Sequence, residues 1–224
     1  HAVANRMAGY QKKNLKKMNK LLVVGDSFVA EDNSQYYEWA WWNRLAKDLR
    51  LTPVNLAITG ASNFNIFHQL IHGMNIGGID KILVVLTAPN RIESVKQPIE
   101  GIVTYEHFKN KEIESWALHE RISNNEIPIE IAETFYDHGA SVSLNILIAN
   151  MILTEASRRN CCILPNLFTE YEKYSWHIKH DIRPREFIDV ESGPLDELQS
   201  GHMYQSWHDK FYEKYKSQLI TTIS

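Results

Sequence analysis

The stretch Leu21-Leu-Val-Val-Gly-Asp-Ser-Phe28 carries the strongest fold signal in this chain. Four consecutive apolar residues predict a buried β-strand that ends at Gly25, where the backbone can turn sharply. Ser27 then lies at the carboxyl end of that strand, which is where open α/β sheets build their sites. Ser27 is therefore a candidate nucleophile. The alternative is that Asp26 and Ser27 only form a turn and cap a helix, a position that both residue types favour.

Strand-like and helix-like segments alternate along the rest of the chain. Short apolar runs predict strands at 20–24, 53–58, 81–86 and 161–164. Apolar residues at helical spacing predict helices at 34–51, 63–73, 142–157 and 205–219, and Gly73 is expected to stop the second of these. This alternation predicts a parallel sheet covered by helices on both faces, a three-layer α/β/α sandwich.

Length and composition fit one globular domain. The chain has 224 residues and a mass of 26.0 kDa, and 44% of its residues are hydrophobic, so one sizeable core is expected over 18–224. Residues 1–17 are polar and basic and are expected to be a tail or an added segment. The formal charge of −3 and the pI near 6.4 argue against a nucleic-acid partner. We expect a cytoplasmic protein without a membrane partner, because the sequence shows no membrane-length apolar run and no leader pattern.

The cysteines and the paired histidines give no sign of a disulfide or a metal site. Cys161 and Cys162 are adjacent, and neighbouring residues of a strand point to opposite faces, so they are expected to be reduced. His177 and His180 have helical spacing but no evident third ligand, so no metal is expected. No dinucleotide or phosphate-loop fingerprint is present, and no cofactor is expected.

Two aromatic or irregular regions leave alternatives open. The segment 92–140 shows no clean periodicity, and we expect an insertion of short helices and loops that serves as a lid or a substrate-selecting rim. Trp39, Trp41 and Trp42 crowd one predicted helix; one of them lines a cleft, or all pack in the core.

Four motifs resemble, in order, the sequence blocks of the SGNH (GDSL-type) hydrolases, a family of serine esterases and lipases. They are Gly25-Asp26-Ser27, the segment 55–63 with Gly60, the segment Thr-Ala-Pro-Asn-Arg at 87–91, and Gly-His-Met at 201–203. The resemblance extends from about residue 18 to the end, with the middle unassigned. The second and third motifs are similar to a divergent, phage-type branch of the family. The resemblance implies the flavodoxin-like α/β fold of that family.

The resemblance also implies roles for individual residues. Ser27 would be the nucleophile and His202 the base, while the Ser27 and Gly60 amides and the Asn90 side chain would hold the oxyanion. The substrate would be a small-molecule or carbohydrate ester with an acyl or acetyl group, cleaved through an acyl-enzyme. His208, inside the last predicted helix, is expected to be solvated or packed.

Two neighbouring residues are candidates for substrate binding. Asn63, in the second motif, is an alternative oxyanion donor. Arg91 either binds an anionic group of the substrate or pairs with Glu93.

The last motif departs from the family pattern. The family places an Asp three residues before the His, and here that residue is Gln199. A Gln carbonyl can orient the ring but brings no charge, so Asp196 or Glu197 would have to substitute. The alternative is a binding or structural protein that kept the fold and lost the chemistry.

Overall fold

The computed structural model describes the chain in segments. These are residues 19–30, 38–87, 91–96, 98–117, 147–148, 151–152, 154–155, 160–164, 198–199, 202–203 and 205–223. Asn90, Asp196, Glu197, His177 and His180 lie outside these residues, as do 1–18, 118–146 and 165–197. Most of the predicted helix 142–157 also lies outside the described residues.

The centre of the fold is a four-stranded parallel sheet in the order β2-β1-β3-β6. Its strands are β1 (Lys20–Val24), β2 (Thr52–Asn55), β3 (Ile79–Val85) and β6 (Asn160–Leu164). This is the flavodoxin-like order, in which the chain reverses direction across the sheet between the first and third strands. The four predicted strands are thus confirmed, as is their parallel arrangement.

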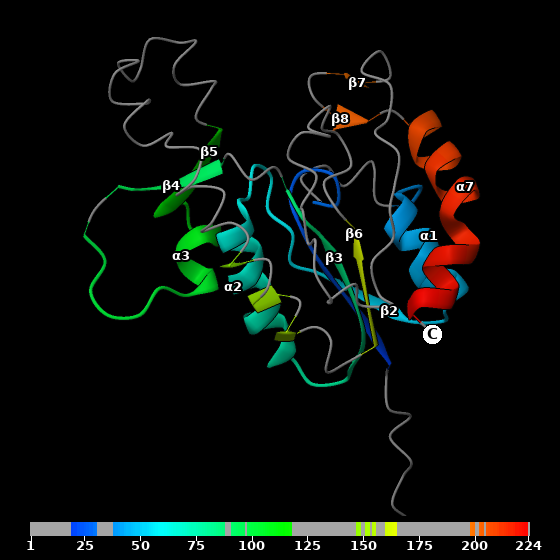
Figure 1. Ribbon diagram of the computed structural model, residues 1–224, viewed down its shortest axis with the longest axis horizontal. Coiled ribbons are helices and arrows are strands. Elements are labelled where there is room, and N and C mark those ends of the chain that lie inside the picture. The colour runs from blue at the N-terminus through cyan, green and yellow to red at the C-terminus, as the bar shows by residue number, and fades with distance from the viewer. Residues whose placement is uncertain are drawn as a thin grey trace, which may run out of the picture.

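Helices cover both faces of this sheet, with α1 (Trp41–Asp48) and α7 (Gln205–Ile223) on one side and α2 (Asn63–Met74) on the other (Figure 1). Alternate residues of β1 point to opposite faces of the sheet and pack against different helical layers. Leu21 and Val23 belong to the core cluster beneath α1 and α7, whereas Leu22 and Val24 belong to the cluster beneath α2. The predicted three-layer sandwich is therefore present. Among the described residues, no helix combines the length and the apolarity needed to cross a bilayer.

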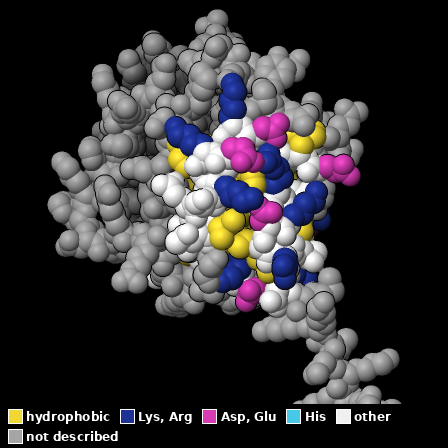
Figure 2. All heavy atoms as spheres, turned by 90° about the vertical axis from the view of Figure 1, so that its right-hand side faces the viewer, with side chains coloured by type: hydrophobic (Ala, Val, Ile, Leu, Met, Phe, Trp, Pro, Cys, Tyr) yellow, Lys and Arg dark blue, Asp and Glu magenta, His cyan; other side chains and the backbone are white. Residues whose placement is uncertain are grey.

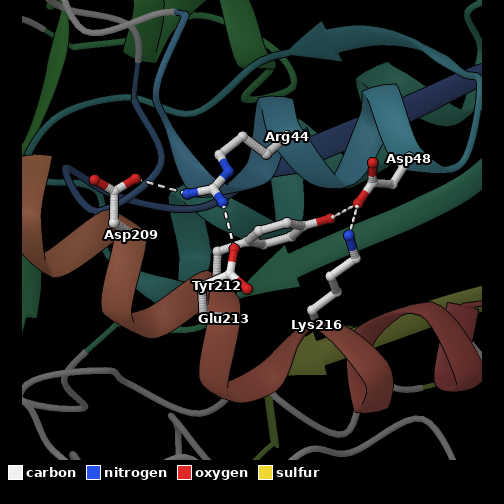
Figure 3. A network of polar contacts seen from close by, with 6 residues as sticks. All are labelled: Arg44, Asp48, Asp209, Tyr212, Glu213 and Lys216. Carbon is white, nitrogen blue, oxygen red and sulfur yellow. Dashed lines mark hydrogen bonds and ion pairs between the residues drawn. The ribbon is translucent and has the colours of Figure 1, made fainter.

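A polar network joins α1 to α7 along the outer edge of their contact (Figure 3). It consists of Arg44, Asp48, Asp209, Tyr212, Glu213 and Lys216. Arg44 binds Asp209 at 2.7 Å and Glu213 at 2.6 Å, and Asp48 accepts from the Tyr212 hydroxyl at 2.7 Å. Figure 2 shows the resulting surface, on which basic and acidic side chains are interspersed. Exposed ion pairs contribute little each, so buried apolar contacts dominate this interface.

The predicted start of α1 and the predicted end of β2 are wrong. Helix α1 begins at Trp41 rather than at 34, because Glu38 and Trp39 form a turn. The Trp41 N–H is bound by His208 Nδ1 of α7 at 3.3 Å, so this cap comes from a distant part of the chain. Strand β2 ends at Asn55, whose side chain accepts from the Ala57 N–H at 2.9 Å and so turns the chain.

Gly73 does not stop α2, contrary to the prediction. The helix continues to Met74, and Gly73 lies against β1. A Cβ at Gly73 would lie 2.5 Å from both Leu22 Cδ atoms, so the glycine is there to allow close packing of helix on sheet.

The described part of the predicted insertion contains regular structure that the sequence did not reveal. Strands β4 (Arg91–Val95) and β5 (Ile113–Ala117) pair antiparallel, with α3 (Tyr105–Lys109) between them. The prediction of helices and loops without strands is therefore wrong here. A second small hairpin pairs β7 (Leu198–Gln199) with β8 (His202–Met203).

Candidate functional site

The candidate site lies at the carboxyl ends of β1 and β3, where the order of the sheet reverses. The connection that leaves β1 runs through α1 on one face, and the connection that enters β3 runs through α2 on the other. Loops that diverge in this way leave a crevice, the usual place for a ligand in an open α/β sheet. Ser27, half-buried, follows β1 at this point.

The turn that carries Ser27 depends on Gly25. A Cβ at Gly25 would lie 2.4 Å from Val29 Cγ2 and 3.0 Å from the Val85 carbonyl oxygen, so only glycine fits. Beyond it, the Asp26 carbonyl accepts from the N–H groups of Val29 and Ala30 at 3.1 and 3.0 Å. Ser27 therefore lies within a hydrogen-bonded turn and not in a loose loop.

Gln69 of α2 clamps the peptide groups of Gly25. Its Oε1 accepts from the Gly25 N–H at 2.8 Å, and its Nε2 donates to the Gly25 carbonyl at 3.1 Å. The same Nε2 donates to Asn65 Oδ1 at 3.1 Å. Gln69 is fully buried. Sequence reasoning missed this residue, and its only sequence signal is a polar residue on the apolar face of a predicted helix.

Asp26, next to Ser27, has a structural role, because its carboxylate links the ends of two strands. It is fully buried, accepts from the Thr87 hydroxyl at 2.6 Å and accepts from the Phe28 N–H at 3.2 Å. Burial raises the pKa of the Asp26 carboxyl, and the Thr87 hydrogen bond and the charge of Arg91 offset only part of that rise. These contacts tie the end of β1 to the end of β3.

Asn63, the first residue of α2, ties that helix to the end of β3. Its Oδ1 accepts from the Thr87 N–H at 3.0 Å and its Nδ2 donates to the Thr87 carbonyl at 3.1 Å. Asn63 is fully buried. The predicted contact of Asn63 with the substrate or the oxyanion stays a prediction, and these contacts give it no support.

Gly60 lies in the loop before α2 and has a positive φ of 75°, a conformation that favours glycine. The Ile58 N–H donates to the Gly25 carbonyl at 3.3 Å, which ties this loop to the turn of Ser27. Among the residues that the structure describes, no acceptor binds the backbone N–H of either Ser27 or Gly60. The predicted role of these two N–H groups as oxyanion donors stays a prediction.

Arg91 and Glu93 do not form the ion pair that was one expectation. Arg91 Nη1 donates to the Gly60 carbonyl at 2.8 Å, and the Glu93 carboxylate accepts from the Ser62 hydroxyl. Burial raises the pKa of Glu93, and the Ser62 hydrogen bond opposes that rise. Both side chains thus reach the loop that contains Gly60.

His202 and Gln199 are partners in the β7–β8 hairpin. The antiparallel register places Gln199 directly opposite His202. Figure 1 shows this hairpin at the end of the molecule toward which β6 points. Because β1 runs parallel to β3 and β3 to β6, the carboxyl end of β1, which Ser27 follows, lies at the same edge of the sheet. The predicted base and its orienting candidate are therefore neighbours in the backbone.

His208 is packed, one of the two alternatives predicted for it. The residue is buried, its Nδ1 accepts from the Trp41 N–H, and its ring lies edge-on to Trp39 at 4.9 Å between centroids. Burial lowers its pKa to about 4. Trp41 and Trp42 are core residues as well.

Comparison with solved structures identifies the fold. No protein-family model matches the sequence, and no curated protein matches it. The structure of TesA is 13% identical over 91% of this chain and 99% of that one, with a TM-score of 0.51. The esterase EstA from Pseudoalteromonas sp. is 12% identical over 91% and 97% of the two chains, with a TM-score of 0.47. The likeness to TesA therefore shows that the chain shares the α/β fold of that protein, and an α/β fold of this kind is what the motifs predicted.

Proposed function

We propose that this chain is a serine hydrolase that cleaves acyl or acetyl esters of small molecules or carbohydrates. One observation carries the proposal: Ser27 occupies a glycine-dependent turn at the reversal point of the sheet, and a hydrogen bond from the Ile58 N–H to the Gly25 carbonyl ties this turn to the loop of Gly60. Within the described part of the chain, the backbone N–H groups of Ser27 and Gly60 have no acceptor. A serine nucleophile needs such donors for the negative charge that develops on the carbonyl oxygen.

In the proposed mechanism, Ser27 Oγ attacks the ester carbonyl while the His202 ring accepts the hydroxyl proton. The N–H groups of Ser27 and Gly60, with the Asn90 side chain, hold the resulting oxyanion. The tetrahedral intermediate expels the alcohol, which takes the proton from His202. Water then attacks the acyl-enzyme with His202 again as base, and the acid leaves. This mechanism uses no metal or organic cofactor.

The test is covalent labelling of the chain with a fluorophosphonate probe, together with turnover of p-nitrophenyl acetate. Ser27→Ala should abolish both while leaving the far-UV circular dichroism and Tm unchanged. Ser217→Ala is the matched control, because Ser217 is exposed on α7. His202→Ala should reduce turnover by several orders of magnitude, as loss of a triad member does. Labelling or turnover that survives Ser27→Ala would refute the assignment.

One observation favours a second function, that of a binding protein without catalysis. Gln199 stands where the family pattern has an Asp, and a neutral partner cannot stabilise the imidazolium that forms during catalysis. Loss of such a carboxylate costs about 10⁴ in rate in a serine protease. A parent chain that binds ester analogues but is not labelled by the probe would support this alternative.

A further inference from the structure

Two side chains of β4 bind the loop that carries Gly60. Arg91 Nη1 donates to the Gly60 carbonyl at 2.8 Å, and the Glu93 carboxylate accepts from the Ser62 hydroxyl. Residues two apart on a strand lie on the same face, so Arg91 and Glu93 form one contact surface. That surface spans the Gly60–Ser62 segment from its first residue to its last.

Within the described part of the chain, three other hydrogen bonds hold this segment, one of them from the Ile66 N–H to the Ser62 carbonyl at 2.9 Å. The Ala61 N–H donates to the Ile58 carbonyl at 3.0 Å, and the Ser62 hydroxyl accepts from the Asn65 N–H at 3.1 Å. The Ser62 hydroxyl therefore both caps α2 and donates to Glu93. Among the described residues, the Gly60 carbonyl has Arg91 as its hydrogen-bond donor.

The proposed reaction requires the Gly60 N–H to be held in a fixed position. A glycine at positive φ has more backbone freedom than any other residue, yet an oxyanion donor must be held to within about 0.5 Å and 10–20° of the productive geometry. A carboxylate as buried as Glu93 is unfavourable unless it is hydrogen-bonded. An apolar residue at this position would avoid that penalty, and it would also leave Ser62 without this acceptor.

We infer that Arg91 and Glu93 are positioning residues that hold the Gly60 backbone N–H in place as an oxyanion donor. The inference rests on the proposed function. It assigns the β4–β5 hairpin a part in catalysis without contact with the reacting atoms. It also gives Arg91 a role other than the predicted binding of an anionic substrate group.

Paired substitutions separate positioning from folding. Glu93→Leu removes the acceptor for Ser62, and Arg91→Met removes the donor to Gly60; each should lower kcat and the rate of fluorophosphonate labelling roughly 10-fold, less than the ~10²–10³-fold expected on loss of an oxyanion donor itself. KM should stay within about 3-fold of the parent. Glu93→Gln keeps an acceptor and should restore most of the rate.

Measuring stability beside activity distinguishes a positioning role of Glu93 from a merely structural one. Because burial raises the pKa of Glu93, its charged form is unfavourable in the folded protein at neutral pH. Glu93→Leu should therefore keep the parental Tm at pH 8 while it loses activity. Glu114→Gln is the matched control on the same hairpin, because Glu114 pairs with the exposed Lys96 at 2.8 Å and should leave kcat unchanged.

The outcomes are distinct. A parent chain that is not labelled at Ser27 overturns the proposed function, and this inference with it. If the parent is labelled but Glu93→Leu and Arg91→Met match its rate, only the inference is overturned. It is equally overturned if Arg91→Met raises KM for a negatively charged ester and leaves kcat unchanged, since Arg91 would then bind substrate. If Glu93→Leu fails to fold, Arg91→Met tests the inference, and Arg91→Lys serves as its conservative variant.

Discussion

The buried histidine of α7 should make the stability of this protein depend on pH in a specific way. His208 Nδ1 accepts from the Trp41 N–H, and burial lowers the pKa of the ring from 6.5 to about 4. The unfolded chain therefore binds a proton near pH 6.5 that the folded protein does not take up until about pH 4. The free energy of unfolding should fall as the pH decreases through this range.

The magnitude follows from the two pKa values. The contribution of His208 to the free energy of unfolding is fully present above pH 6.5 and is lost as the pH falls toward 4. The loss is at most 1.36 kcal/mol per pH unit, or about 3 kcal/mol in all. His208→Leu removes the titration but leaves the Trp41 N–H unpaired, which costs about 1–3 kcal/mol. At pH 8 the variant should therefore be the less stable protein. By pH 5 the difference should have shrunk by about 2 kcal/mol.

The assay is urea unfolding of the parent and His208→Leu at pH 8, 7, 6 and 5, followed by far-UV circular dichroism. Comparing the two proteins cancels groups that titrate in both, Glu93 among them. Ser217→Ala, a substitution at an exposed position of the same helix, should follow the parent at every pH. A difference that stays constant or grows as the pH falls would refute the neutral, buried state of His208.

Three further substitutions test the site and its supports. Gln199→Asp should raise the esterase rate and move its onset to higher pH, because a carboxylate beside His202 favours the charged ring; an unchanged pH–rate profile would argue against Gln199 as the orienting residue. Gly73→Ala should lower the stability by about 1–3 kcal/mol through overpacking, whereas Gly77→Ala, with nothing within 4 Å, should have little effect on Tm. Gln69→Leu leaves a buried donor and acceptor unpaired and should cost about 2–6 kcal/mol in urea unfolding; a loss below 1 kcal/mol would contradict the clamp.

The parts of the fold that were predicted correctly depend on local patterns. Continuous apolar runs gave β1, β3 and β6, because strands buried between two helical layers have no polar face. The helical spacing of its apolar residues correctly predicted α2, whereas its cap, the Ser62 hydroxyl that accepts from the Asn65 N–H, was not predicted. The motif at Gly25 and Ser27 correctly predicted that Ser27 follows the carboxyl end of β1.

The errors arise where a distant residue decides local structure. Helix α1 begins at Trp41 because a histidine of α7 binds its first N–H, 167 residues away. The β4–β5 hairpin was missed because α3 separates its short strands, so no tight-turn signal marks it. Gln69 was missed because both of its targets on Gly25 are backbone groups, which any sequence at that position would offer.

The two adjacent cysteines of β6 have a consequence for experiments on this protein. Cys161 belongs to the core cluster on the α2 side and Cys162 to the cluster on the α1–α7 side, and both are free thiols with no exposed surface. Burial raises the pKa of the Cys162 thiol, so this group is unreactive until its surroundings open. With one cysteine replaced by alanine, the labelling rate of the other reports how often a single layer leaves the sheet. The chain thus carries one native chemical probe for each helical layer, separated by a single peptide bond.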